Sequence, residues 1–143
     1  SVIVINNINV SVGENFYVKD EGNKLVIYDF NYNIISEYTE EYTNYEIFDK
    51  RFIIVTNKNI KKIINKDGKI LINGTQIKVA NDNKYVLVDN AVYDNNLNKV
   101  YVLDFTENFE YFAEFGNDLL IIEPYEKESK SIVVDLINKT RKF

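Results

Sequence analysis

The acidic residues that end three apolar runs are the first side chains in this sequence that could do chemistry. Asp29, Asp104 and Asp135 each follow such a run, and Asn65 takes the matching place after a fourth. Paired carboxylates can hydrolyse glycosidic bonds, one acting as the acid and the other as base or nucleophile. A catalytic pair needs two different environments, whereas these residues recur at equivalent turns, where Asp and Asn side chains bond the turn backbone. We therefore expect structural roles and predict no catalytic residue.

The side chains that are missing narrow the chemistry further. The 143 residues include no Cys, His, Met or Trp and a single Pro. Histidine bases, thiol nucleophiles, disulfides and structural zinc sites are therefore excluded. We expect a protein that is not an enzyme and that needs no cofactor.

One segment has the oxygen-ligand spacing of a calcium loop. Asp94, Asn96 and Asn98 stand at positions 1, 3 and 5 of such a loop, but Lys99 replaces the glycine of position 6 and Phe105 replaces the glutamate of position 12. We interpret this segment as a polar hairpin tip and predict no metal site.

The basic side chains are concentrated in one third of the chain. Residues 49–81 hold eight basic and two acidic side chains, although the whole chain has a net charge of -5. Lys58, Lys61, Lys62 and Lys66 belong to one expected hairpin, where the adjacent Lys61 and Lys62 must point to opposite faces of a strand. The segment predicts a local electrostatic patch.

The segment just before this basic stretch is acidic and rich in tyrosine, reading Glu-Tyr-Thr-Glu-Glu-Tyr-Thr-Asn-Tyr-Glu over residues 37–46. We expect the opposite charges to match within the chain, between copies or with a partner, and tyrosine rings suit protein contacts. The alternative is a solvated charged edge that keeps outer strands from pairing. The residues predicted to contact a partner are Lys58, Lys61, Lys62, Lys66, Tyr38, Tyr42, Tyr45, Glu40 and Glu41.

The composition also limits the classes of partner that we expect. A pI near 4.8 and only two arginines argue against nucleic acid. The longest apolar runs, such as Leu119–Ile122, are too short to cross a bilayer, so no membrane insertion is predicted. The first residues carry no signal-peptide pattern. Because the chain begins at Ser and contains no Met, we expect a trimmed product, and no location is assigned.

A repeat of about 34 residues organises the whole chain. Each unit has an alternating apolar pair, a short polar turn, an apolar run, and then a second run that ends at Asp or Asn. The runs are rich in Ile, Val, Tyr and Phe and are separated by polar turns, as strands are. We expect a single all-β domain over residues 1–143, with units near 8–44, 45–75, 76–110 and 111–143.

Each unit resembles a blade of a WD40-like β-propeller. The clearest match runs from Asp118-Leu-Leu-Ile-Ile-Glu to Ser131-Ile-Val-Val-Asp135-Leu-Ile-Asn-Lys-Thr140. The Gly-His and Trp-Asp dipeptides of that family are absent, and the units are shorter than its usual repeat. The resemblance therefore implies an architecture and no functional residues.

The strand pattern predicts a small four-bladed propeller. In the third unit we expect strands near 76–80, 84–89, 99–104 and 107–110. The fourth unit lacks a secure outer strand, and we expect Val2–Ile5 to supply it as a closing strand, with Thr140–Phe143 competing for the same place. The alternatives are part of a larger propeller or an open solenoid of β-hairpins.

The expected function is a non-enzymatic binding or scaffold module that contacts another protein. The alternatives are a propeller that binds or processes carbohydrate, and a structural subunit of a larger assembly. A homo-oligomer formed through an open blade edge is a further expectation, since an unpaired edge strand invites pairing.

Overall fold

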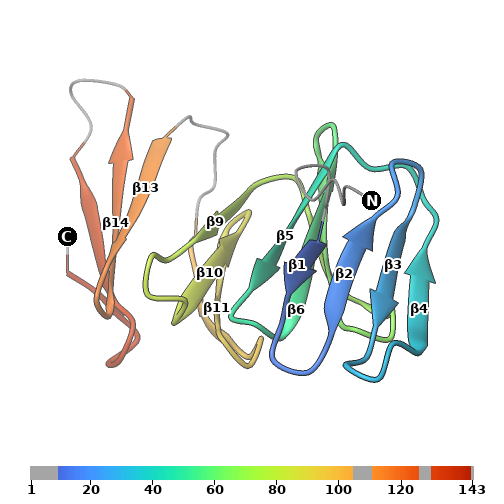
Figure 1. Cartoon of the computed structure of the whole chain (residues 1–143). Helices are drawn as coiled ribbons and strands as arrows, with labels where there is room; N and C mark the ends of the chain where they lie inside the picture. Colours follow the sequence, from blue (N-terminus) through green and yellow to red (C-terminus); the bar gives the residue numbers. More distant parts are fainter. Residues whose placement is uncertain (1–9, 105–110, 126–129, 143) are drawn as a thin grey trace, which may run out of the picture. The chain divides into compact units, whose positions relative to one another are not determined.

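The computed structural model describes residues 10–104, 111–125 and 130–142, and throughout these ranges the regular structure is β-strand (Figure 1). The strands form four antiparallel sheets of four strands each. Every sheet is a meander, in which each strand pairs with the next one along the chain. The predicted all-β repeat of four-stranded blades is confirmed. The chain divides into two compact units, Ser1–Thr75 and Gln76–Phe143.

The first unit holds two sheets. Their strands, in chain order, are β1 (Val10–Val12), β2 (Tyr17–Asp20), β3 (Leu25–Tyr28) and β4 (Ile34–Tyr38) in one sheet, and β5 (Asn44–Phe48), β6 (Phe52–Asn57), β7 (Ile60–Ile64) and β8 (Ile70–Gly74) in the other.

The second unit repeats the arrangement. Its strands are β9 (Ile77–Val79), β10 (Tyr85–Val88), β11 (Ala91–Asp94) and β12 (Lys99–Val102) in one sheet, and β13 (Tyr111–Gly116), β14 (Leu119–Pro124), β15 (Ile132–Asp135) and β16 (Thr140–Arg141) in the other.

The predicted strand order of the third repeat is wrong by one strand. The third strand of that sheet is β11, which was not predicted, and residues 99–102 form the fourth strand instead of the third. The cause is the two-residue turn at Asp89 and Asn90, where Asp89 adopts a φ of 53° and reverses the chain at once. Residues 107–110, expected as the outer strand, lie outside the described residues.

In the fourth sheet, β16 takes the outer position that two segments were expected to contest. Thr140 pairs with Asp135 and Arg141 pairs with Val134. Val2–Ile5 lies outside the described residues, so its closing role stays a prediction.

The core of the first unit lies between its two sheets and follows from the alternation of side chains along each strand. Register places Val18 and Ile27 opposite each other on one sheet, and both are completely buried. Ile53 and Ile64 pair in the same way on the other sheet and are equally buried. All four belong to one hydrophobic cluster. The second unit has its own cluster, which includes Leu120, Ile122 and Val134.

The hairpin that joins the third and fourth strands has the same chemistry in all four sheets. An Asp or Asn stands at the end of the third strand or directly after it, and its side-chain Oδ1 accepts hydrogen bonds from two backbone N–H groups of the turn. The pairs of donors are Asn31 and Asn33 for Asp29, Asp67 and Lys69 for Asn65, Asn96 and Asn98 for Asp94, and Ile137 and Asn138 for Asp135. The structural role predicted for Asp29, Asn65 and Asp135 is confirmed.

Asp94, and not Asp104, is the equivalent residue of the third sheet. The segment with calcium-loop spacing is therefore a hairpin, as interpreted, because the Asp94 carboxylate accepts N–H groups of its own turn. Asp104 follows the outer strand and lies 3.5 Å from Arg141.

Candidate functional site

A small cavity on the first unit gathers four of the nine residues predicted to contact a partner. Its volume is about 220 Å³. The lining consists of Tyr38, Glu40, Glu41 and Lys62, together with Val55, Asn57 and Ile60. The acidic, tyrosine-rich segment and the basic hairpin thus meet at one place.

Strand register explains why Lys62 reaches this cavity. Val55 of β6 pairs with Lys62 of β7, so both side chains stand on the same face of their sheet. Val55 is only 2% exposed and belongs to the core cluster of the first unit, so this is the face that packs against the other sheet of the unit. Tyr38, the last residue of β4, packs into the same cluster from the other sheet. The cavity therefore lies where the two sheets of the unit meet.

An ion pair holds one side of the cavity. Lys62 Nζ lies 2.9 Å from Glu40 Oε2. This hydrogen bond and the charge of Lys62 lower the pKa of Glu40, and the bond to Glu40 raises the pKa of Lys62. Burial raises the pKa of the Tyr38 hydroxyl, which interacts with both of these groups. At neutral pH the carboxylate and the ammonium are both charged, and Tyr38 keeps its proton.

Glu41 supplies the carboxylate of this cavity that has no partner among the described residues. Its side chain is exposed, and within residues 10–104, 111–125 and 130–142 the structure gives its carboxylate no ion pair or hydrogen bond. The cavity therefore has one carboxylate neutralised by Lys62 and a second one available to a ligand.

The other two tyrosines predicted to contact a partner have their hydroxyl groups engaged inside the unit. Tyr42 and Tyr45 are half-buried and pack against the core cluster. Tyr45 Oη lies 3.0 Å from Ser11 Oγ. The rings of Tyr38 and Tyr42 meet edge to face, with centroids 6.4 Å apart. Much of the surface of these rings is buried by packing between the sheets.

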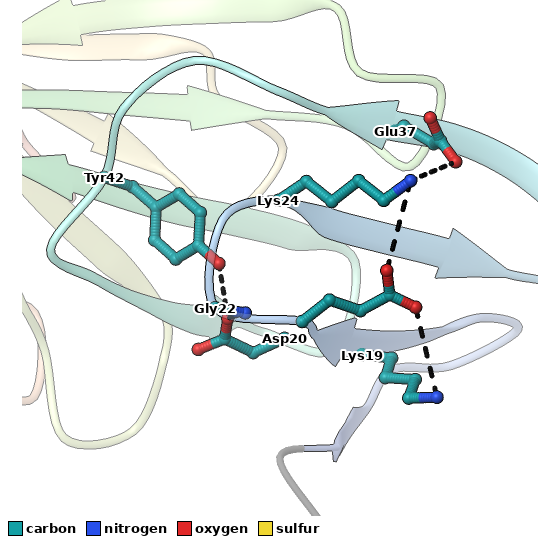
Figure 2. A network of polar contacts seen from close by, with 7 residues as sticks. Lys19, Asp20, Gly22, Lys24, Glu37 and Tyr42 are labelled. Carbon is teal, nitrogen blue, oxygen red and sulfur yellow. Dashed lines mark hydrogen bonds and ion pairs between the residues drawn. The ribbon is translucent and has the colours of Figure 1, made fainter.

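Figure 2 shows the polar network beside Tyr42. The Tyr42 hydroxyl donates to Asp20 Oδ1, which also accepts from the backbone N–H of Gly22 (Figure 2). Burial, followed by the bond to Asp20, raises the pKa of Tyr42. Lys24 Nζ lies 3.3 Å from Glu37 Oε1. This ion pair links β4 to the turn that follows β2. The acidic segment is thereby anchored to the first sheet.

The remaining lysines of the predicted set do not line the cavity. Lys61 pairs with Thr56 and so stands on the face opposite Lys62, as expected for adjacent strand residues. Lys58 lies in the turn between β6 and β7 with a φ of 55°. Lys66 lies in the β7–β8 turn, where its carbonyl accepts a hydrogen bond of 2.7 Å from Ser36 Oγ. Lys61 and Lys62 therefore do not share one face of the sheet.

Sequence reasoning missed three lining residues, Val55, Asn57 and Ile60. Two of them flank the β6–β7 turn, and their apolar or amide side chains carry no signal of a site. The continuous apolar run that ends at Val55 predicts that this residue is buried. It does not predict the place beside Tyr38, because that depends on how two sheets pack.

A second hollow on the first unit is wider and more open. Its volume is about 890 Å³, and Gly13, Glu14, Asp49, Lys50 and Arg51 are among its lining residues. Arg51 is already bound to Asp49, with Nη2 2.7 Å from Oδ2. Glu14 and Lys50 add one charge of each sign to the lining, which therefore carries no net charge.

The described residues contain no group of three or more acidic, His or Cys side chains arranged to hold a metal ion. In the same part of the chain, no helix is long and apolar enough to cross a membrane. The lining of the cavity offers carboxylates, an ammonium group, an aromatic ring and aliphatic walls.

No protein-family model matches the chain, and no curated protein matches it. Solved β-propeller structures do. A eukaryotic initiation factor matches with a TM-score of 0.55 at 13% identity, over 99% of this chain and 45% of that one. Kluyveromyces lactis Hsv2, with one loop replaced by a Gly-Ser linker, matches with a TM-score of 0.51 at 12% identity, over 89% of this chain and 48% of that one. BamB from Moraxella catarrhalis matches at 14% identity with a TM-score of 0.49, over 94% of this chain and 48% of that one.

These matches show the fold. Together with the four meander sheets, the two structures with the higher TM-scores confirm the resemblance to a β-propeller. The chain spans about half the length of the solved structures it matches. A fold of this type is consistent with a scaffold that binds other proteins.

Proposed function

We propose that this chain is a non-enzymatic binding module that recognises another protein through the first unit. The observation that supports it is the cavity of about 220 Å³, in which an acidic segment, an aromatic ring and an aliphatic wall converge. Ligand pockets for drug-sized molecules usually measure about 300–1,000 Å³. A smaller cavity suits a single side chain of a protein better than a whole metabolite.

The side chains that are present favour binding over catalysis. The chain has no His or Cys, and the Asp and Asn residues that recur along it cap hairpins. Glu40 is held by Lys62 and its pKa is lowered, which makes it a poor proton donor at neutral pH.

The experiment is a selection from a displayed library of random peptides with the purified chain as bait. We expect peptides to be enriched that no longer bind when Glu41 and Ile60 are both replaced by Ser. A matched bait carries Glu46→Ser and Ile70→Ser, which removes one exposed acid and one exposed isoleucine outside the cavity. Failure to enrich any peptide, or equal loss with the matched bait, contradicts the proposal.

Carbohydrate binding is the second candidate, and one observation favours it. Phe112 and Tyr125 are 64% and 49% exposed, and their rings meet edge to face with centroids 4.3 Å apart. Exposed aromatic faces suit stacking on sugars. A glycan array with a turnover assay tests this candidate. Binding that Phe112→Ser abolishes supports it, and release of sugar would contradict the non-enzymatic proposal.

A further inference from the structure

We infer that the cavity of Tyr38, Glu41, Val55, Asn57 and Ile60 receives the cationic side chain of an arginine or lysine on the partner. This inference rests on the proposed function and specifies its chemistry. Three observations carry it: the charge of the lining, the shape of its apolar part, and a buried oxygen without a donor.

The charge of the lining favours a cation. Glu40 and Lys62 neutralise each other across 2.9 Å, and Glu41 leaves one negative charge in the rim. An anionic ligand would have to displace Glu40 from Lys62 and would face Glu41 as well. A guanidinium or ammonium group instead forms a charge-assisted hydrogen bond with a carboxylate, which is stronger than a neutral one.

The apolar part of the lining suits the stem of such a side chain. Ile60 is 52% exposed although it lines a cavity, and the buried Val55 is also part of the lining. Arginine and lysine carry three or four methylene groups that pack along apolar surface while the charged end stays near polar groups. Tyr38 also lines the cavity, but the residue is only 6% exposed and its ring belongs to the core cluster, so it acts as part of the wall.

The buried oxygen belongs to Asn57. Its Oδ1 has no hydrogen-bond partner in the described part of the chain and is closed to solvent. A buried acceptor without a donor costs stability. Rotation of this side chain in the cavity wall would offer the oxygen to a ligand that carries only donors. Guanidinium and ammonium groups are such ligands, because they have no acceptor.

The test is a titration of the isotope-labelled chain followed by NMR. The probes are three blocked pentapeptides of glycine with Arg, Lys or Gln at the centre. We expect the Arg and Lys peptides to shift the backbone signals of Ile60, Asn57 and Glu41, and the Gln peptide, which has a similar stem but no charge, to leave them unchanged. High salt should weaken binding, because the carboxylate is exposed.

Two variants make the test specific to the cavity. Glu41→Gln should weaken Arg-peptide binding about tenfold, because it replaces a charge-assisted hydrogen bond by a neutral one. Glu46→Gln is the control: it removes the same charge from β5 at an exposed position outside the cavity, and should leave binding unchanged. Equal effects of the two variants, or equal shifts from the Gln and Arg peptides, would overturn the inference.

Failure of this inference is distinguishable from failure of the proposed function. If the displayed library enriches cavity-dependent peptides without basic residues, the binding module stands and the cationic ligand is wrong. If the library enriches nothing and the Arg peptide causes no shifts, both fail.

Discussion

Single residues in the left-handed region determine the shape of the hairpins between third and fourth strands. Tyr32 and Gly68 take the same position in two of these turns, with φ of 68° and 82°. Glycine adopts this conformation freely, whereas a residue with a Cβ does so at a cost of about 1–2 kcal/mol. Tyr32 is 79% exposed, so little packing offsets that cost.

We therefore predict that Tyr32→Gly stabilises the chain by about 0.5–1 kcal/mol, after allowing for the greater unfolded-state entropy of glycine. Gly68→Ala should destabilise it by a similar amount, since an added Cβ has ordinary contacts, 3.6 Å from Ser36, and only the φ is unfavourable. Urea denaturation measures both. Tyr32→Ala is the control, because it keeps the strained φ, and stabilisation by Tyr32→Ala as large as by Tyr32→Gly would contradict the explanation.

Tyr85 is a second residue with a measurable effect, this time on the pH dependence of stability. Its hydroxyl donates to Asp118 Oδ1 at 2.7 Å. Burial, together with that bond, raises the pKa of Tyr85 to about 12. The bond to Tyr85 lowers the pKa of Asp118.

The signs of the two shifts define the pH range of the contribution. The folded chain keeps the Tyr85 proton above pH 10, where an unfolded tyrosine loses it, so stability falls as pH rises from 10 towards 12. Asp118 is ionised in the folded chain below its ordinary pKa of 3.8, so its contribution is present above that pH and is lost on further acidification.

We predict that Tyr85→Phe costs about 1 kcal/mol at neutral pH, as the loss of one hydrogen bond does. The difference in unfolding free energy between wild type and variant should shrink above pH 10 and below pH 4, because these are the ranges in which the wild type loses the contribution. Urea denaturation of both proteins across the pH range measures this difference in unfolding free energy. A difference that stays constant from pH 3 to pH 11 would contradict the assignment.

Among the elements, the hairpin cap gives a clear prediction because the chain contains its own control. Asp94 Oδ1 accepts two backbone N–H groups at 2.9 Å each, and Asn65 does the same at 3.0 Å in the second sheet. Asp94→Ala should therefore destabilise the chain by about 1–2 kcal/mol, whereas Asp94→Asn should be nearly neutral. Thermal unfolding of the two variants measures the difference in stability. An equal loss of stability in both variants would contradict a cap that depends on the side-chain oxygen.

Gly13 lies in the turn between β1 and β2, close to the turn between β5 and β6, at a point that leaves no space for a side chain. A Cβ there would lie 2.5 Å from the Phe16 ring and 2.8 Å from the Lys50 carbonyl oxygen. The next residue, Glu14, donates its backbone N–H to that same carbonyl at 2.7 Å.

We predict that Gly13→Ala destabilises the chain by more than about 2 kcal/mol, as overpacking against backbone does. Gly116→Ala is the matched control, because nothing lies within 4 Å of the added Cβ and its φ is not positive; it should be neutral or slightly stabilising. Urea denaturation compares the two, and similar midpoints would contradict the steric argument.

The sequence was sufficient to predict most elements because alternation and turn chemistry are local. Four sheets of four strands and the capping role of Asp29, Asn65 and Asp135 followed from these patterns. β11 was missed because Asp89 and Asn90 form a turn of only two residues, so that the apolar runs on either side look like one segment. The outer strand β16 has two residues, too few for a periodic signal.

The candidate site could be predicted only in part. The opposite charges of the segments around Glu40 and Lys62 indicated that they would match, and the structure brings them within 2.9 Å. The cavity itself depends on packing between two sheets, and neither Asn57 nor Ile60 carries a signal of it. No pattern in one strand reports which residue of another sheet will lie across from it.

For the whole molecule, self-association through an outer strand remains a prediction. β8 ends its sheet, and two of its residues, Ile70 and Leu71, are 40% and 38% exposed. Edge strands with apolar side chains invite pairing with another chain, and charged residues prevent it. We expect sedimentation equilibrium to show concentration-dependent association that Leu71→Lys weakens. A monomer at all concentrations up to about millimolar would contradict it.

The tyrosines that donate to carboxylates also provide built-in optical reporters. The chain has eleven tyrosines and no tryptophan, so its near-ultraviolet absorbance comes mainly from phenol groups. Several tyrosines have raised pKa values, and the shift is largest for Tyr42 in the first unit and Tyr85 in the second, so these two should ionise last in an alkaline titration. Replacing one or the other by Phe assigns the late tyrosinate signal to one unit, which lets the two halves of an unlabelled chain be followed separately.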